Sequence, residues 1–131
     1  MRSERSRFSL LLISDDPHVQ RTASWILLDE GYYVAVCATV GLAAAQAAEL
    51  SADAVLWDVG LRRDLDEEAR VLRRAFPRAR LVGIHLHDDS SKVHVDAECH
   101  LHIPFAAEDL LNCVADALTA SVGQVSTHLH R

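Results

Sequence analysis

The sequence predicts an α/β fold of one domain, with a parallel five-stranded sheet covered by helices on both faces. Three observations predict it. The 131 residues are 50% apolar and 24% charged, which is enough to bury one core and excludes both a disordered chain and a multidomain machine. Five short runs are strand-like, and most of them are apolar nearly throughout, as strands covered on both faces are. Segments with helical spacing separate these runs, and this alternation favours parallel strands joined by helices.

The first strand and the first helix meet at an acidic pair. Residues 8–14 (FSLLLIS) form the first apolar run, and Asp15, Asp16 and Pro17 follow it. An acidic N-cap and a proline at the first helical position predict a helix start. We expect this helix to end at Gly31.

The first helix has two different faces. Its spacing predicts an inward stripe made of Val19, Ala23, Ile26 and Leu27. Trp25 and Leu28 fall on roughly the opposite side. They are a candidate contact patch for a partner or for a second copy of the chain, in a homodimer. Alternatively, they are single exposed apolar residues, which are common in proteins.

The remaining elements follow the same alternation. Strands are predicted at 32–38, 53–58, 80–86 and 98–103. Helices are predicted at 39–50, capped by Thr39, at 66–76 and at 106 to about 120. The 66–76 helix begins with acidic residues and ends with arginines, which matches the helix dipole. We expect 88–96 to be a loop or a very short helix.

Composition excludes several classes of protein. No apolar stretch reaches the roughly 18 residues that a membrane span needs, and residues 1–7 do not resemble a secretory signal, so we expect a cytoplasmic protein. The net charge is −6 and the basic residues are spread along the chain, which argues against nucleic-acid binding. Three cysteines, Cys37, Cys99 and Cys113, lie far apart without a CxxC motif, so we expect buried thiols.

Acidic residues stand where two of the predicted strands end. Asp15 and Asp16 follow the first strand and Asp58 closes the third. If these strands are neighbours, three carboxylates converge, and like charges that close raise one another's pKa unless a cation joins them. A hard divalent ion such as Mg²⁺ prefers oxygen ligands of this kind. The alternative interpretation is that Asp16 only caps a helix and Asp58 only ends a strand.

Three motifs occur along the chain in a set order. They are the apolar strand closed by Ser14-Asp15-Asp16, the DAVLWD strand closed by Asp58, and Pro104-Phe105 after the fifth strand. In this order they resemble the receiver domain of two-component response regulators, over about residues 8–120. The resemblance implies a flavodoxin-like sheet of order 2-1-3-4-5. It also implies that Asp58 is the phosphoacceptor and that Mg²⁺ is bound by Asp15, Asp16, Asp58 and the backbone carbonyl of Gly60.

The implied function is phosphorelay signalling. A sensor histidine kinase or a phosphotransfer protein would pass a phosphoryl group from its phosphohistidine to Asp58, a transfer that needs mostly alignment and charge neutralisation. The chain would then be a signalling module and not an ordinary enzyme. An enzyme or small-ligand binder is disfavoured because no GxGxxG or GxxxxGK[ST] motif follows the first strand. We expect residues 1–120 to form the receiver-like domain and 121–131 to be a polar tail or a cut linker.

Three positions depart from the pattern of the family. Ile103 stands where a receiver has lysine, His85 where it has serine or threonine, and His100 where it has an aromatic residue. Ile103 cannot donate the charge-assisted hydrogen bond to a phosphoryl group, which is worth roughly 1.5 to 3 kcal/mol. Two cases stay open: Asp58 accepts phosphate with Mg²⁺, or the chain is a pseudo-receiver that binds a partner without phosphate. The connection from His85 to Ile103 is also short, so we expect a shortened or absent fourth helix.

Two His-x-His motifs fall on strands that should be adjacent, His85 with His87 and His100 with His102. Strand alternation places both histidines of a motif on one face. One hypothesis is a transition-metal site of four imidazoles. A second is that His85 and His100 replace the usual relay and titrate near neutral pH. The third is that these histidines fill space and form hydrogen bonds.

Overall fold

The sheet of the computed structural model is the predicted one. The structure describes residues 8–60, 65–86, 97, 99–103 and 105–127. All neighbouring strands pair in parallel, in the order β2-β1-β3-β4-β5. The strands are β1 (Ser9–Ile13), β2 (Tyr33–Cys37), β3 (Ala54–Gly60), β4 (Arg80–Leu86) and β5 (Cys99–Ile103). This order confirms the doubly wound, flavodoxin-like arrangement.

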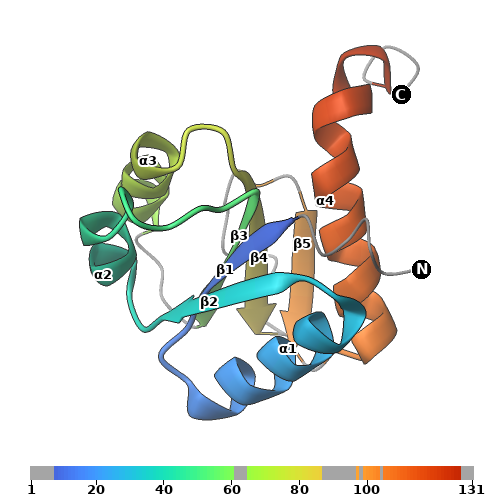
Figure 1. The fold of residues 1–131 in the computed structure, drawn as a ribbon, viewed down its shortest axis with the longest axis horizontal. Coiled ribbons are helices and arrows are strands. Elements are labelled where there is room, and N and C mark those ends of the chain that lie inside the picture. Colours follow the sequence, from blue (N-terminus) through green and yellow to red (C-terminus); the bar gives the residue numbers. More distant parts are fainter. Residues whose placement is uncertain (1–7, 61–64, 87–96, 98, 104, 128–131) are drawn as a thin grey trace.

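Helices cover both faces of the sheet (Figure 1). The described residues form four helices: α1 (Pro17–Glu30), α2 (Val40–Ala45), α3 (Asp66–Ala75) and α4 (Ala107–Thr127). Side chains of α1 and α4 belong to one core cluster, and side chains of α2 and α3 belong to the other. None of these described helices is long and apolar enough to cross a membrane.

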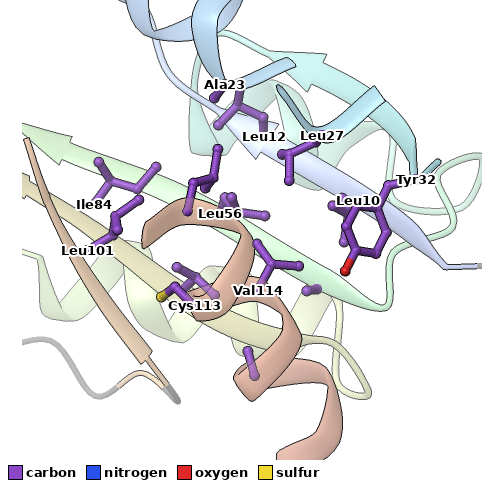
Figure 2. Close-up of a cluster of buried hydrophobic side chains, with 14 of the residues drawn as sticks. Leu10, Leu12, Ala23, Leu27, Tyr32, Leu56, Ile84, Leu101, Cys113 and Val114 are labelled. Atoms are coloured by element: carbon purple, nitrogen blue, oxygen red, sulfur yellow. The ribbon is translucent and has the colours of Figure 1, made fainter. Parts of the chain in front are cut away.

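The apolar runs of the central strands supply both core clusters, because successive side chains of a strand point to opposite faces. Leu10 and Leu12 belong to the cluster under α1 and α4, whereas Leu11 and Ile13 belong to the cluster under α2 and α3. Figure 2 shows the first cluster, with the central-strand residues packed between α1 and α4. This division explains why the strands are apolar nearly throughout.

The start and end of α1 confirm the capping prediction. Asp16 is the N-cap, Pro17 is the first helical residue, and Gly31 ends the helix with a φ of 111° in the left-handed region. Glycine adopts that conformation at no steric cost. The side chains of Val19, Ala23 and Leu27 are buried.

Three element boundaries differ from the predicted ones by two residues or more. The α-helix of α2 ends at Ala45 and not at Leu50, because the following residues form tight turns, such as the hydrogen bond from Glu49 N to Gln46 O at 2.9 Å. Strand β3 continues two residues past Asp58. Helix α4 continues to Thr127, so part of the expected polar tail is helical. No proline interrupts that segment, and polarity alone does not end a helix.

Some predictions fall outside the described residues. The loop or short helix at 88–96, and with it the shortened or absent fourth helix, falls on residues 87–96. The described chain resumes at residue 97, just before β5. Pro104 also lies outside the described part of the chain.

Candidate functional site at the carboxyl edge of the sheet

The candidate site lies where β1 and β3 end side by side. The two strands are paired up to Ile13 and Trp57, so the next residues, Ser14 and Asp58, are neighbours. The Ser14 hydroxyl donates a hydrogen bond to Oδ2 of Asp58 at 2.7 Å. The same hydroxyl oxygen accepts a hydrogen bond from the backbone N–H of Asp16 at 3.1 Å. Ser14 therefore links the helix start to the half-buried carboxylate of Asp58.

The backbone around Ser14 is held from two further sides. Its N–H donates to the carbonyl of Cys37, at the end of β2, over 3.0 Å. Its carbonyl oxygen accepts a hydrogen bond from the side chain of Gln20 on α1. Ser14 is only 2% exposed, so its position is fixed by β1, β2, β3 and α1 together.

Ser14 is the functional contact that sequence reasoning missed. It appeared in the sequence only as part of the motif that leads to Asp15 and Asp16. The sequence held no direct signal for this contact, because it depends on the register of β1 and β3, which places Ser14 beside Asp58.

Asp15 and Asp16 are both exposed, in the segment between β1 and α1. Asp16 caps the helix: its Oδ1 accepts a hydrogen bond from the backbone N–H of His18 at 2.9 Å. This is the local role that the alternative interpretation assigns to it. The other half of that interpretation does not hold, because β3 continues from Asp58 to Gly60.

The fit of a divalent cation depends on how these oxygen atoms are used. Among the described residues, no group of three or more histidine, cysteine, aspartate or glutamate side chains is arranged to hold a metal ion. One oxygen of Asp16 and one of Asp58 already accept hydrogen bonds from the chain itself. Gly60 follows an irregularity of the β3–β4 pairing and lies opposite His85. The described residues therefore do not present a preformed Mg²⁺ site.

His85, on β4, lies next to His100 on β5. The distance between His85 Nε2 and His100 Nδ1 is 2.8 Å, which is a hydrogen bond between the two rings. The His102 ring lies beside them, with its centroid 5.4 Å from that of His85. Gly83 leaves room for this pair, because a Cβ atom there would lie 2.9 Å from His85 Nε2. The histidines thus occupy the two predicted relay positions as one contacting pair.

The environment of His85 keeps its imidazole neutral. The residue is 3% exposed, and its Nδ1 has no hydrogen-bond partner among the described residues. Burial lowers the pKa of His85 to about 4, with smaller contributions in the same direction from His100 and His102. This pKa contradicts the hypothesis of titration near neutral pH for His85; for His100 the hypothesis stays a prediction.

The histidines also do not form the hypothesised metal site, as far as the described residues extend. Three of the four lie there, and no metal-binding group includes them. His85 Nε2 and His100 Nδ1 are hydrogen-bonded to each other at 2.8 Å, so the lone pair of one of these nitrogens is already engaged. His87 lies outside the described residues. The third hypothesis, histidines that pack and form hydrogen bonds, agrees best with this geometry.

Ile103 is the last residue of β5 and pairs with Leu86 of β4. Its side chain is half-buried and packs against the core cluster under α1 and α4. An aliphatic side chain in this place stabilises the core and offers no hydrogen bond to a group at the carboxyl edge.

The cysteines correct another prediction. Cys99 of β5 and Cys113 of α4 form a disulfide, with their Cα atoms 6.1 Å apart. Only Cys37 remains as a buried thiol among the described residues, and burial raises its pKa. The sequence separation of 14 residues hid this pair, because the strand and the helix come together only in the folded sheet.

Comparison with solved structures identifies the class of fold. A response regulator receiver protein from Sinorhizobium medicae WSM419 is 24% identical, with a TM-score of 0.69 over 86% of this chain and 95% of that one. The chemotaxis response regulator CheY4 of Vibrio cholerae is 22% identical, with a TM-score of 0.72 over 85% and 98%. The N-terminal domain of a response regulator/sensory box/GGDEF 3-domain protein from Carboxydothermus hydrogenoformans is 21% identical, with a TM-score of 0.76 over 89% and 98%.

The chain therefore has the fold of response-regulator receiver domains. No family model matches its sequence, and no curated protein does. At these identities the structural likeness establishes the fold, and the function has to be argued from the site.

Proposed function

We propose that the chain is a receiver-type signalling module that works by binding other proteins, without Mg²⁺-dependent phosphorylation of Asp58. The likeness to receiver domains supports a role in two-component signalling. The observation that carries the second part is the hydrogen bond from the Ser14 hydroxyl to Asp58 Oδ2 at 2.7 Å. This contact engages one oxygen of the carboxylate within the chain, whereas a phosphoacceptor needs a cation and an open line of attack.

Two further features support the proposal. Ile103 takes no part in binding a phosphoryl group, because its side chain packs against the core. The relay positions hold two histidines that bond to each other at 2.8 Å, and the buried one is neutral at pH 7. A phosphoryl group on Asp58 would therefore find neither a charged donor at position 103 nor a free hydroxyl at position 85.

The module that we propose is not an enzyme, and its partner class is a sensor histidine kinase or a phosphotransfer protein. Nothing in the proposal requires the partner to transfer its phosphoryl group. We expect the module to act in the cytoplasm, as the sequence predicts.

A second candidate function keeps Asp58 as the phosphoacceptor. It is favoured by the place of Asp58, half-buried on the central strand β3 at the carboxyl edge, where ligands of parallel sheets bind. A carboxylate oxygen would attack the phosphorus of a phosphohistidine, so that a P–O bond forms, the P–N bond breaks, and the imidazole nitrogen keeps the electron pair. In this candidate Mg²⁺ would be held by Asp15, Asp16, Asp58 and the Gly60 carbonyl, an arrangement that the described residues do not show.

Intact mass spectrometry separates the two candidates. The chain is incubated with acetyl phosphate and Mg²⁺, beside Asp58→Asn and a matched control, Asp53→Asn, which alters the exposed aspartate just before β3. A receiver that accepts phosphate from the same donor serves as the positive control. We expect no phosphoryl gain on any form of this chain. A gain of one phosphoryl group on the parent and on Asp53→Asn, but not on Asp58→Asn, would overturn the proposal and support the second candidate.

A Mg²⁺ titration gives an independent measurement. Trp57 directly precedes Asp58 and is fully buried, so its fluorescence reports binding at the carboxyl edge. In a Trp25→Phe background, only Trp57 emits. We expect Mg²⁺ to leave this emission unchanged, whereas a saturable change that Asp58→Asn removes would contradict the proposal.

A further inference from the structure

An exposed apolar surface lies on α1 and the adjacent edge strand β2. Trp25 is 73% exposed and Leu28 is 53% exposed, both on α1, and Val36 of β2 is 43% exposed. The three side chains line one hollow between α1 and β2, together with Pro17, Gln20, Arg21 and Ser24. We call these seven residues the Trp25 surface. Scattered apolar residues are ordinary on a protein surface, but a tryptophan beside an apolar hollow is typical of a contact site.

Trp25 stands as a ridge between two hollows. The hollow on one side belongs to the Trp25 surface. The hollow on the other side is lined by His18, Arg21, Thr22, Trp25, Ile26 and Asp29. A ridge with a hollow on each side can interlock with an identical ridge, because each tryptophan then fills a hollow of the other molecule. Such a self-complementary surface is what a two-fold interface requires.

The charges around Trp25 are arranged for the same symmetry. Arg21 lies four residues before Trp25 and Asp29 lies four residues after it, and all three are exposed. Residues four apart lie one above the other on a helix. When two copies of α1 pack antiparallel about a two-fold axis at Trp25, Arg21 of each copy faces Asp29 of the other. Parallel packing would instead bring like charges together.

We propose that two copies of the chain form a two-fold dimer through α1. Trp25 of each copy enters the hollow between α1 and β2 of the other, and two ion pairs form between Arg21 of one copy and Asp29 of the other. This interface does not depend on the chemistry of Asp58, so its test is separate from that of the proposed function.

The first test is the oligomeric state of the full chain. Sedimentation velocity at concentrations from about 1 to several hundred µM should show a monomer–dimer equilibrium. Trp25→Glu should weaken the dimer about 30-fold or more, as loss of a central tryptophan anchor does. The matched control is Leu42→Glu, which alters an exposed leucine of α2, on the other face of the sheet, and should leave the dimer unchanged.

The second test exchanges the charges. Arg21→Glu and Asp29→Arg should each weaken the homodimer, because each variant places two like charges opposite each other. A mixture of the two variants should restore dimers, since every opposed pair in the mixed dimer is again of opposite sign. The far-UV circular dichroism and the thermal midpoint of each variant check that α1 stays folded.

Three results would overturn the proposal. The first is a parent chain that stays monomeric at the highest concentration, which would leave the Trp25 surface to a protein of another kind. The second is equal weakening by Leu42→Glu and Trp25→Glu, which would place the interface elsewhere. The third is a mixture of charge variants that remains monomeric, which would exclude the antiparallel pairing of α1.

Discussion

The small side chain of Ser14 holds two parts of the carboxyl edge in place, the carboxylate of Asp58 and the start of α1. A serine hydroxyl can both accept and donate a hydrogen bond, and the buried Ser14 hydroxyl does both: it accepts from the Asp16 N–H and donates to Asp58. The serine therefore fixes the carboxylate of Asp58 and the first turn of α1 at the same time. An alanine in its place would leave a half-buried carboxylate and a backbone N–H without this partner.

We predict that Ser14→Ala lowers the free energy of unfolding by about 1 to 3 kcal/mol. Urea denaturation at pH 7 measures the change. Ser24→Ala is the matched control, because the buried Ser24 hydroxyl has no hydrogen-bond partner among the described residues, and its removal should cost nothing. Equal effects of the two substitutions would show that the Ser14–Asp58 hydrogen bond contributes no net stability.

His85 makes stability depend on pH. Its pKa is about 4 in the folded chain, against 6.5 for an ordinary histidine. Between these values the unfolded chain binds a proton that the folded chain does not, so the free energy of unfolding falls as the pH drops from 6.5 to 4. This contribution of His85 to the free energy of unfolding amounts to roughly 3 kcal/mol. It is fully present above pH 6.5 and is lost as the pH falls to 4.

The measurement is urea denaturation of the parent and of His85→Leu at pH 7.0, 5.5 and 4.5. We predict that the loss of stability across this range is clearly smaller in His85→Leu, whatever its stability at pH 7. His18→Leu, which removes an exposed histidine, should retain the pH dependence of the parent. If both variants follow the parent, His85 is not the group responsible.

At the scale of the elements, the sequence predicts strands and helix starts better than helix ends. Start signals are local: Asp16 with Pro17 and Thr39 each cap the helix that follows. The end of α2 has no such signal in the sequence: tight turns replace the α-helix after Ala45. The partners of Cys99 and Ser14 are hidden for a different reason, because their contacts form only when elements distant in sequence pack together.

The Cys99–Cys113 disulfide fixes α4 to the edge strand β5. It closes a short loop, with 14 residues of separation, and a loop of that size restricts the unfolded chain by about 3 kcal/mol. We predict that a reductant lowers the free energy of unfolding by about this amount. Urea denaturation with and without dithiothreitol measures it.

Two variants control this measurement. The double variant Cys99→Ala/Cys113→Ala should be insensitive to the reductant, whereas Cys37→Ala should respond as the parent does, because Cys37 is a free cysteine. Identical denaturation midpoints of the parent with and without reductant would contradict a stabilising disulfide.

At the scale of the whole molecule, the class of fold followed from the apolar periodicity, and the sheet order that the structure shows was implied by the resemblance to receiver domains. The state of the site followed from neither. Alternating apolar periods are repeated over the entire chain, so errors at single boundaries do not change the predicted class of fold. The site depends on single atoms. The aspartates lie near the predicted strand ends. However, one oxygen of Asp16 accepts a hydrogen bond from the N-terminus of α1, and one oxygen of Asp58 accepts a hydrogen bond from Ser14. Periodicity carries no information about such choices.

The central strands contribute side chains to both core clusters, and this arrangement predicts how the molecule unfolds. Leu12 packs under α1 and α4, and its neighbour Leu11 packs under α2 and α3; both are fully buried. Because the same strands carry both sets of side chains, loss of packing on one face removes the support of the other. Each substitution, Leu11→Ala or Leu12→Ala, should lower the free energy of unfolding by about 2 to 5 kcal/mol, and unfolding should remain a single transition.

Far-UV circular dichroism and Trp57 emission, recorded in a Trp25→Phe background, should give coincident denaturation curves in both variants. If one probe changes at a lower urea concentration than the other, the two layers unfold separately, and the sheet does not couple them.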